Sequence, residues 1–166
     1  IRSDGSSIDS SFAAFASIGS TLYFIADDGG GNIELWKSDG TEIGTTVVVD
    51  VSGGSLSPDN LTPLGNDLLF VSSQFSPDGR QLWKTNEATG TTTVVKDLDG
   101  AGSAAQISGL VRSGDRVFFA GNDGVSGREL WVTDGSDAGT IQLADLNPGS
   151  ADSLYGILAV GLGGVL

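Results

Sequence analysis

Carboxylate side chains stand beside predicted hairpin turns at two places in the chain, and calcium binding is a chemistry that they could perform. Asp27 and Asp28 precede Glu34 in the first place, and Asp123 precedes Glu129 in the second. Calcium takes oxygen ligands, many of them from Asp and Glu, and extracellular modules bind it with about millimolar affinity. Carboxylates that converge on one turn would therefore form a weak calcium site.

A further acidic stretch, Asp97–Ser103, imitates the start of a calcium-binding loop. It lacks the third acidic ligand and the closing glutamate that the EF-hand pattern requires. The simpler interpretation is that Asp-Gly pairs form turns on an acidic surface, because Asp bonds its own backbone and Gly accepts a positive φ. We favour the turn interpretation and keep calcium as the alternative. We assign no metal ligand and no cofactor.

Paired carboxylates are the second chemistry that the sequence offers. Glycosidases use two acids that lie about 5–9.5 Å apart. One active site needs unique residues, so a catalytic pair would have to break the internal repeat described below. The acids that break it are Glu42, Glu87 and Asp99, and all of them fall in predicted surface turns without His or Arg clusters. We expect no enzyme and assign no catalytic residue; a hydrolase with paired carboxylates is the second alternative.

The composition excludes several other classes of function. The chain has no Cys and no His, which removes disulfides, thiol nucleophiles, Cys/His zinc sites and the Ser-His-Asp triad. With 21 Asp and Glu against 8 Lys and Arg, the net charge of −13 repels phosphate backbones and anionic lipids. Gly29–Gly31 precedes a strand and has no Lys beside it, which argues against a phosphate-binding loop. We therefore expect neither nucleic acid nor a membrane as a partner.

The sequence shows no segment for membrane insertion or for secretion. Its longest apolar stretch, Ile157–Leu166, is about half of the ~20 residues that a spanning helix needs. The chain opens with Ile1 instead of Met, and no basic residues followed by an apolar run stand at its start. We interpret it as a mature product or a fragment.

An internal repeat organises the whole chain. The tryptophans Trp36, Trp83 and Trp131 lie 47 and 48 residues apart, and each follows Glu-Leu or Gln-Leu. An apolar triplet with an aromatic residue lies upstream of each Trp, and Gly-Thr followed by a β-branched run that ends at Asp lies downstream. In chain order the triplets are Leu22–Phe24, Leu68–Phe70 and Val117–Phe119, the glycines are Gly44, Gly90 and Gly139, and the closing acids are Asp50, Asp97 and Asp145. The same features in the same order indicate a repeated structural unit.

Each unit is predicted to contain four short antiparallel strands. In the second unit we expect them at Asn60–Leu64, Asp67–Ser72, Gln81–Thr85 and Thr91–Leu98, joined by tight turns. Neighbouring apolar residues in a strand point to opposite faces, so both faces of each sheet are apolar, as in blades packed between two neighbours. The pattern predicts an all-β fold of β-propeller-type blades; a β-sandwich or a β-solenoid is less favoured.

The predicted organisation is three repeats and part of a fourth. Residues 1–11 match the tail of a preceding repeat, 12–59 form repeat 1, 60–106 form repeat 2, 107–153 form repeat 3, and 154–166 match the first strand of repeat 4. Propellers close with about four to eight blades. The expected partners are therefore further repeats of a longer chain or other copies of this chain, because an unclosed stack exposes strand edges and apolar faces.

The segment Glu34–Thr41, which reads Glu-Leu-Trp-Lys-Ser-Asp-Gly-Thr, resembles the ELWxxDGT repeat of large bacterial secreted and surface proteins. The third copy, Glu129–Ser136, has Ser at the last position. The second copy, Gln81–Ala88, is degenerate: it has lost Glu, Gly and Thr, and its turn is one residue shorter. The resemblance covers essentially the whole chain as three units.

The resemblance implies a bacterial extracellular or cell-surface setting and a propeller-like structural module with no agreed catalytic chemistry. Within the motif we expect Leu and Trp to pack, and Asp39-Gly40 and Asp134-Gly135 to form hairpin turns. The favoured function is therefore a non-catalytic structural or interaction module. A calcium-dependent module that binds a glycan or a protein is the first alternative.

Overall fold

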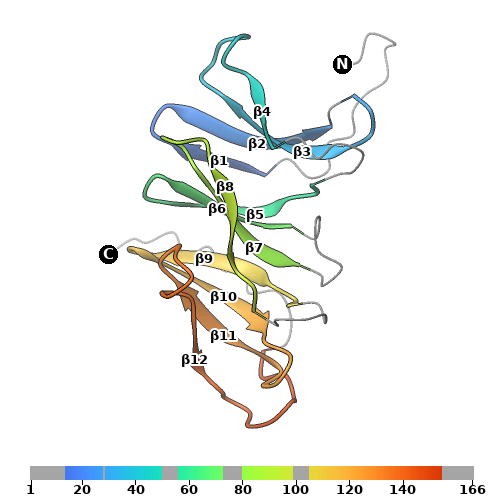
Figure 1. Ribbon diagram of the computed structural model, residues 1–166, viewed down its shortest axis with the longest axis vertical. Coiled ribbons are helices and arrows are strands. Elements are labelled where there is room, and N and C mark those ends of the chain that lie inside the picture. The colour runs from blue at the N-terminus through green and yellow to red at the C-terminus, as the bar shows by residue number, and fades with distance from the viewer. Residues whose placement is uncertain (1–13, 28, 50–55, 73–79, 99–104, 155–166) are drawn as a thin grey trace.

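The computed structural model describes residues 14–27, 29–49, 56–72, 80–98 and 105–154, and within them the chain forms twelve β-strands and no helix (Figure 1). The strands form three antiparallel sheets of four, each in chain order. The first sheet contains β1 (Phe15–Ile18), β2 (Thr21–Asp27), β3 (Ile33–Ser38) and β4 (Thr46–Val49); the second contains β5 (Asp59–Leu64), β6 (Asp67–Ser72), β7 (Gln81–Asn86) and β8 (Thr92–Lys96); the third contains β9 (Ser108–Ser113), β10 (Arg116–Asn122), β11 (Arg128–Thr133) and β12 (Ile141–Ala144). The expectation of an all-β fold with four-stranded antiparallel units is confirmed.

The strands predicted for the second unit agree closely with the structure. β6 has the predicted limits, β5 begins one residue earlier, and β7 ends one residue later. β8 is shorter at both ends than the predicted Thr91–Leu98. The predicted tail at residues 1–11 lies outside the described residues, as does the predicted partial repeat from residue 155 onward.

The three sheets share one irregularity, which places the repeat motif at the same position in each. Pairing between the third and fourth strands shifts register between Leu35 and Trp36, and likewise between Leu82 and Trp83 and between Leu130 and Trp131. A β-bulge bends its strand and increases the local twist. The pairing of the fourth strand with the motif strand is therefore interrupted at the same motif position in each sheet.

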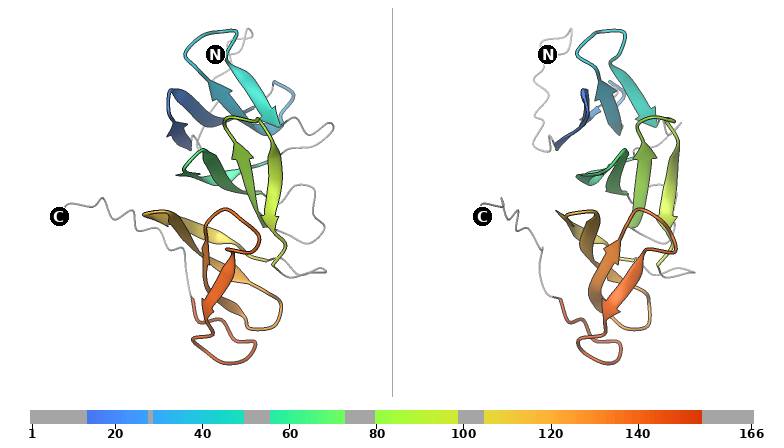
Figure 2. Two further views of the ribbon diagram at one scale, coloured as in Figure 1. Left: turned by 60° about the vertical axis from the view of Figure 1, so that its left-hand side comes forward. Right: turned by 90° about the vertical axis from the view of Figure 1, so that its left-hand side faces the viewer.

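The sheets follow one another along the long axis of the molecule in chain order (Figures 1 and 2). The first strands of neighbouring sheets lie side by side, β1 beside β5 and β5 beside β9. No helix long and apolar enough to cross a bilayer occurs in the described part of the chain.

Among the described residues the apolar core consists of two layers, one between each pair of neighbouring sheets. Tyr23 and Leu35 of the first sheet pack with Phe70 of the second sheet. The other face of the second sheet, which includes Leu69, packs with Phe119 of the third sheet. These five side chains are at most 1 % exposed. The second sheet is thus buried on both faces, and this explains why its strands are apolar at successive positions.

Candidate functional site

The Asp-Gly-Thr segment of the first motif forms a hydrogen-bonded turn between β3 and β4. Asp39 Oδ1 accepts hydrogen bonds from the backbone N–H of Thr41 at 2.9 Å and from its hydroxyl at 2.7 Å. The Thr41 hydroxyl accepts from the N–H of Gly44 at 2.9 Å. Gly40 has a φ of +92°, which is the left-handed conformation that favours glycine. The predicted turn role of Asp39 and Gly40 is confirmed.

The third motif forms the same turn with Ser in place of Thr. Asp134 Oδ1 accepts from the N–H of Ser136 at 2.9 Å and from its hydroxyl at 2.6 Å, and that hydroxyl accepts from the N–H of Gly139 at 2.9 Å. Gly135 has a φ of +86°. Of the side chain at this position the turn uses only the hydroxyl group, so Ser makes the same hydrogen bonds as Thr.

The glycine of each downstream Gly-Thr pair makes room for the motif aspartate. A Cβ atom on Gly44 would lie 2.0 Å from Asp39 Oδ1, and one on Gly139 would lie 2.0 Å from Asp134 Oδ1. These distances are far below van der Waals contact, so any side chain at either position would displace the carboxylate. The five-residue separation of Asp and Gly in both copies is therefore a steric requirement of the turn.

The turn hydrogen bonds favour the ionised form of both aspartates. The hydroxyl and the N–H of Thr41 lower the pKa of Asp39. Those of Ser136 lower the pKa of Asp134, and Arg116, whose guanidinium lies 3.6 Å from that carboxylate, adds to the effect. These shifts follow from hydrogen bonding to a charged acceptor and need no bound cation.

The degenerate second motif forms a different, shorter turn that also begins with a side-chain oxygen. Asn86 Oδ1 accepts from the N–H and the hydroxyl of Thr89 at 3.1 and 3.3 Å. The Asn86 side chain also donates to Asp67 at 2.6 Å. A side-chain oxygen at the start of the turn is thus retained, although the Asp-Gly pair is lost.

The motif glutamates, which the sequence offered as calcium ligands, lie in the interior instead. Glu34 and Glu129 are 2 % and 0 % exposed. Glu34 Oε1 accepts from the N–H of Leu56, at the entry to the second sheet, at 3.3 Å. Glu129 Oε2 accepts from the N–H of Leu146 at 3.1 Å and from the hydroxyl of Ser153. Each carboxylate therefore fastens the connection that leaves its own sheet.

The hairpin aspartates are engaged in local turns. Asp27 Oδ1 accepts from the N–H groups of Gly29 and Gly31 at 2.6 and 3.1 Å. Asp123 accepts from the N–H groups of Val125 and Ser126 at 2.9 and 2.7 Å. Partial burial raises the pKa of Asp123, but these hydrogen bonds outweigh burial and lower the pKa overall.

Within the residues that the structure describes, no group of three or more Asp or Glu side chains is placed to hold a metal ion. Glu34 and Glu129 do not join the hairpin aspartates in such a group. Asp28 and the segment 99–104, which contains most of the acidic stretch after Asp97, lie outside the described residues. The turn interpretation therefore accounts for Asp39, Asp123 and Asp134.

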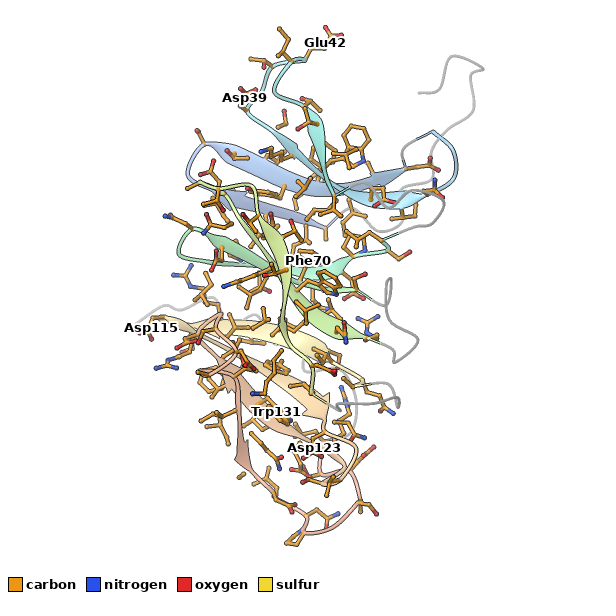
Figure 3. The ribbon with its side chains drawn as sticks, in the orientation of Figure 1. Asp39, Glu42, Phe70, Asp115, Asp123 and Trp131 are labelled. Carbon is orange, nitrogen blue, oxygen red and sulfur yellow. The ribbon has the colours of Figure 1, made fainter. Side chains whose placement is uncertain are left out.

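The two repeat-breaking acids that the structure describes, Glu42 and Glu87, lie in loops of different sheets. Glu42 is exposed at the tip of the β3–β4 loop (Figure 3). Glu87 is half-buried in the β7–β8 turn, where its carboxylate accepts from the hydroxyl of Thr21 in the first sheet at 3.1 Å. Asp99 lies outside the described residues. Glu87 thus contributes a contact between the first and second sheets.

Two arginines that the sequence analysis did not single out line an open pocket of about 350 Å³ between the second and third sheets. Arg80 donates to Asp59 at 2.6 Å and to the carbonyl of Ile107 at 3.0 Å. Arg128 donates to the carbonyl of Leu154 at 3.0 Å and to the hydroxyl of Ser108. Each guanidinium therefore links the first strand of its own sheet to the connection that follows its sheet.

A sequence signal for these arginines does exist. In the second and third copies an Arg stands directly before the Gln-Leu-Trp or Glu-Leu-Trp triplet, whereas the first copy has Ile33 there. A basic residue repeated at one motif position is informative in a chain with only 8 Lys and Arg. Both arginines have a structural role, because the hydrogen bonds of each guanidinium join a first strand to a connection between elements.

The outer face of the first sheet carries a row of aromatic rings that no other sheet covers in the described part of the chain. The ring centroids of Phe15 and Phe24 lie 6.5 Å apart, and those of Phe24 and Trp36 lie 6.4 Å apart with the rings inclined by 22°. Phe15 is 62 % exposed, and Leu22, which lies two residues before Phe24 on the same face of β2, is 39 % exposed. We call these four residues the aromatic face. Large exposed apolar patches mark interaction sites more often than single exposed residues do.

The comparisons with known proteins support the fold and do not identify a family. No family model matches the chain, and no curated protein matches it significantly. One similar solved structure is described as the AtxE2 isopeptidase in its apo form, with a TM-score of 0.59 and 16 % sequence identity over 81 % of this chain. The chain spans about a fifth of that structure, since the match covers 20 % of its length. At this identity the likeness extends to the fold alone.

Proposed function

We propose that the chain is a non-catalytic structural and interaction module of a bacterial extracellular or cell-surface protein. The observation that carries the proposal is the use of the repeat motif for folding. Asp39 and Asp134 hold turns, and Glu34 and Glu129 are buried and fasten connections. These four motif carboxylates are thus committed to the architecture and do not converge on a cleft.

The sheets of this module are proposed to be β-propeller-type blades. Three features support this architecture: four antiparallel strands in chain order, face-to-face packing of sheets, and first strands that lie beside one another. In a propeller the blades surround a central channel. The three sheets of the described residues fall short of the usual four to eight blades, so we expect further blades from other copies or from further repeats of a longer chain.

The proposed activity is therefore association through the ends of the stack. The experiment is the solution mass of the polypeptide, measured by light scattering over a range of concentrations. The proposal predicts stable multiples of 16.8 kDa that grow in population with concentration. A folded protein that remains at 16.8 kDa up to the highest soluble concentration would contradict it.

A further inference from the structure

The aromatic face has two counterparts inside the molecule, and both are covered by the preceding sheet. The position of Leu22 is occupied by Leu68 in the second sheet and by Val117 in the third sheet. Leu68 and Val117 are fully buried, whereas Leu22 is 39 % exposed. The same position in the repeat is thus buried wherever a sheet precedes it.

The ring pair of the aromatic face also has a matched counterpart. Phe119 and Trp131 of the third sheet stack with centroids 6.3 Å apart and an inclination of 21°, nearly the geometry of Phe24 and Trp36. Phe119 and Trp131 are 0 % and 6 % exposed and pack against the second sheet, while Phe24 and Trp36 are only half-buried. Among the described residues, no sheet covers the aromatic face of the first sheet, although its ring geometry matches that of a covered face.

The two sheet-on-sheet interfaces within the chain show which side chains cover this kind of face. Tyr23 and Leu35 of the first sheet cover the second sheet, and Leu69 and Leu82 of the second sheet cover the third sheet. Register places Phe118 and Leu130 at the same positions in the third sheet, on its face away from the second sheet. Both are half-buried, and in β12 of the same sheet Ile141 is 51 % exposed.

We propose that a second copy of this chain covers the aromatic face, with the third sheet of one copy packed on the first sheet of the next. This inference rests on the proposed function and specifies its contact: a head-to-tail interface that repeats the two sheet-on-sheet interfaces within the chain. Such an interface joins two different surfaces, so an assembly that has not closed into a ring keeps one free face of each kind at its ends. Each copy has a net charge of −13, and added salt should therefore strengthen the contact by screening repulsion.

The test uses one charged substitution on each face and a matched control. Phe15→Glu blocks the aromatic face, Phe118→Glu blocks the opposite face, and Ile43→Glu places the same charge on a loop residue that is 93 % exposed and belongs to neither face. Each single face variant should raise the concentration for half-association by about tenfold or more, a change of about 1.4 kcal/mol, whereas Ile43→Glu should behave as the wild type. Far-ultraviolet circular dichroism should show an unchanged fold for Phe15→Glu, because this side chain is already 62 % exposed.

Mixing the two face variants gives the sharper result. Phe15→Glu keeps an intact third-sheet face and Phe118→Glu keeps an intact aromatic face, so an equimolar mixture should form a 1:1 dimer that grows no further. A symmetric contact between two aromatic faces would instead leave Phe118→Glu fully associated by itself. If both face variants associate as strongly as the wild type, the head-to-tail contact is overturned, and the proposed function still stands. A wild type that never associates would contradict the proposed function itself.

Discussion

The aspartate turn shows how the motif residues act together. Asp134 accepts two hydrogen bonds from Ser136, and its carboxylate occupies the space that a side chain on Gly139 would need. In the first copy, Asp39 and Gly44 repeat both relations. The Gly-Thr pair of the repeat is therefore part of the Asp-Gly-Thr turn, although the two lie apart in the sequence.

Substitution of Gly139 should test this steric coupling. Gly139→Ala is expected to destabilise the protein by about 1–3 kcal/mol, because its Cβ would overlap the Asp134 carboxylate. Asp134→Ala should cost about 1 kcal/mol through lost hydrogen bonds. The double variant should cost less than the sum, since the overlap disappears with the carboxylate. Urea denaturation of the four proteins measures the cycle, and strict additivity would show that the two residues do not interact.

Acid should remove part of the stability through three aspartates. The pKa values of Asp39, Asp123 and Asp134 are lowered in the folded state. Their stabilisation is therefore fully present above the unfolded value of about 3.8 and is lost as the pH falls through the lower folded values. The urea midpoint should decline over this acid range. A variant with Asn at all three positions should decline less steeply, and an equal decline would contradict the assignment.

At the residue scale the sequence predicted turns better than it predicted burial. Asp-Gly pairs carry their own local chemistry, so the sequence alone could place Asp39 and Asp134 in turns. Glu34 and Glu129 are charged residues next to acidic hairpins, and a glutamate is rarely buried. Their role depends on the connection after the fourth strand, which returns to lie against the start of the motif strand. A contact between residues so far apart produces no local sequence pattern, so the burial of these glutamates could not be predicted.

Between elements, the buried motif glutamate joins the motif strand to the connection beyond the fourth strand. Glu129 is the second residue of β11, and its carboxylate reaches Leu146 and Ser153, which lie 17 and 24 residues further along the chain. The second copy has Gln81 at this position. A neutral side chain with one carbonyl oxygen is therefore compatible with the architecture.

Replacement of Glu129 should distinguish the roles of its oxygen and its charge. Glu129→Ala should destabilise by about 2–3 kcal/mol, because the N–H of Leu146 and the hydroxyl of Ser153 lose their acceptor. Glu129→Gln should cost about 1 kcal/mol or less, since its carbonyl oxygen can still accept. Chemical denaturation would give both values. A larger loss for Gln than for Ala would mean that the negative charge itself is required.

Arg80 should be the most sensitive of the exposed arginines. Its guanidinium joins Asp59 to the carbonyl of Ile107 and so connects the second and third sheets. With its side chain 38 % exposed, Arg80→Ala is expected to cost about 1 kcal/mol. Arg116→Ala is the matched control and should change stability by less than about 0.5 kcal/mol, because its ion-pair distances are 3.6 and 3.9 Å. Equal effects of the two substitutions would show that Arg80 does not stabilise the contact between the second and third sheets.

At the element scale, strands were predictable and the contacts between sheets were not. Short β-branched and aromatic runs between Gly, Asp and Asn define β5 to β7 to within a residue. The contacts of Arg80 depend on which connection approaches which strand, and this is fixed only when the sheets stack. The Arg that precedes the motif in two copies was the available sequence signal. Its partners could not be predicted from the sequence, because they are brought together only when the sheets stack.

For the whole molecule, melting experiments can decide the calcium alternative. Asp123 holds a turn, and Glu34 and Glu129 are buried, so we expect the same melting temperature in calcium and in chelator. A rise of several degrees in calcium would contradict this expectation. The first substitutions to make would then be Asp97→Asn and Asp99→Asn, in the acidic stretch that only partly lies within the described residues.

Within the described part of the chain, only the second sheet is covered by a sheet on both faces, so the three units should differ in how often they open. Its backbone amides should exchange with deuterium most slowly, since opening it breaks two apolar layers, whereas opening an end sheet breaks one. Stability in such an array grows with every added neighbour. A copy docked on the first or third sheet would turn an end unit into an internal one, and protection from exchange at that end would then report on assembly residue by residue.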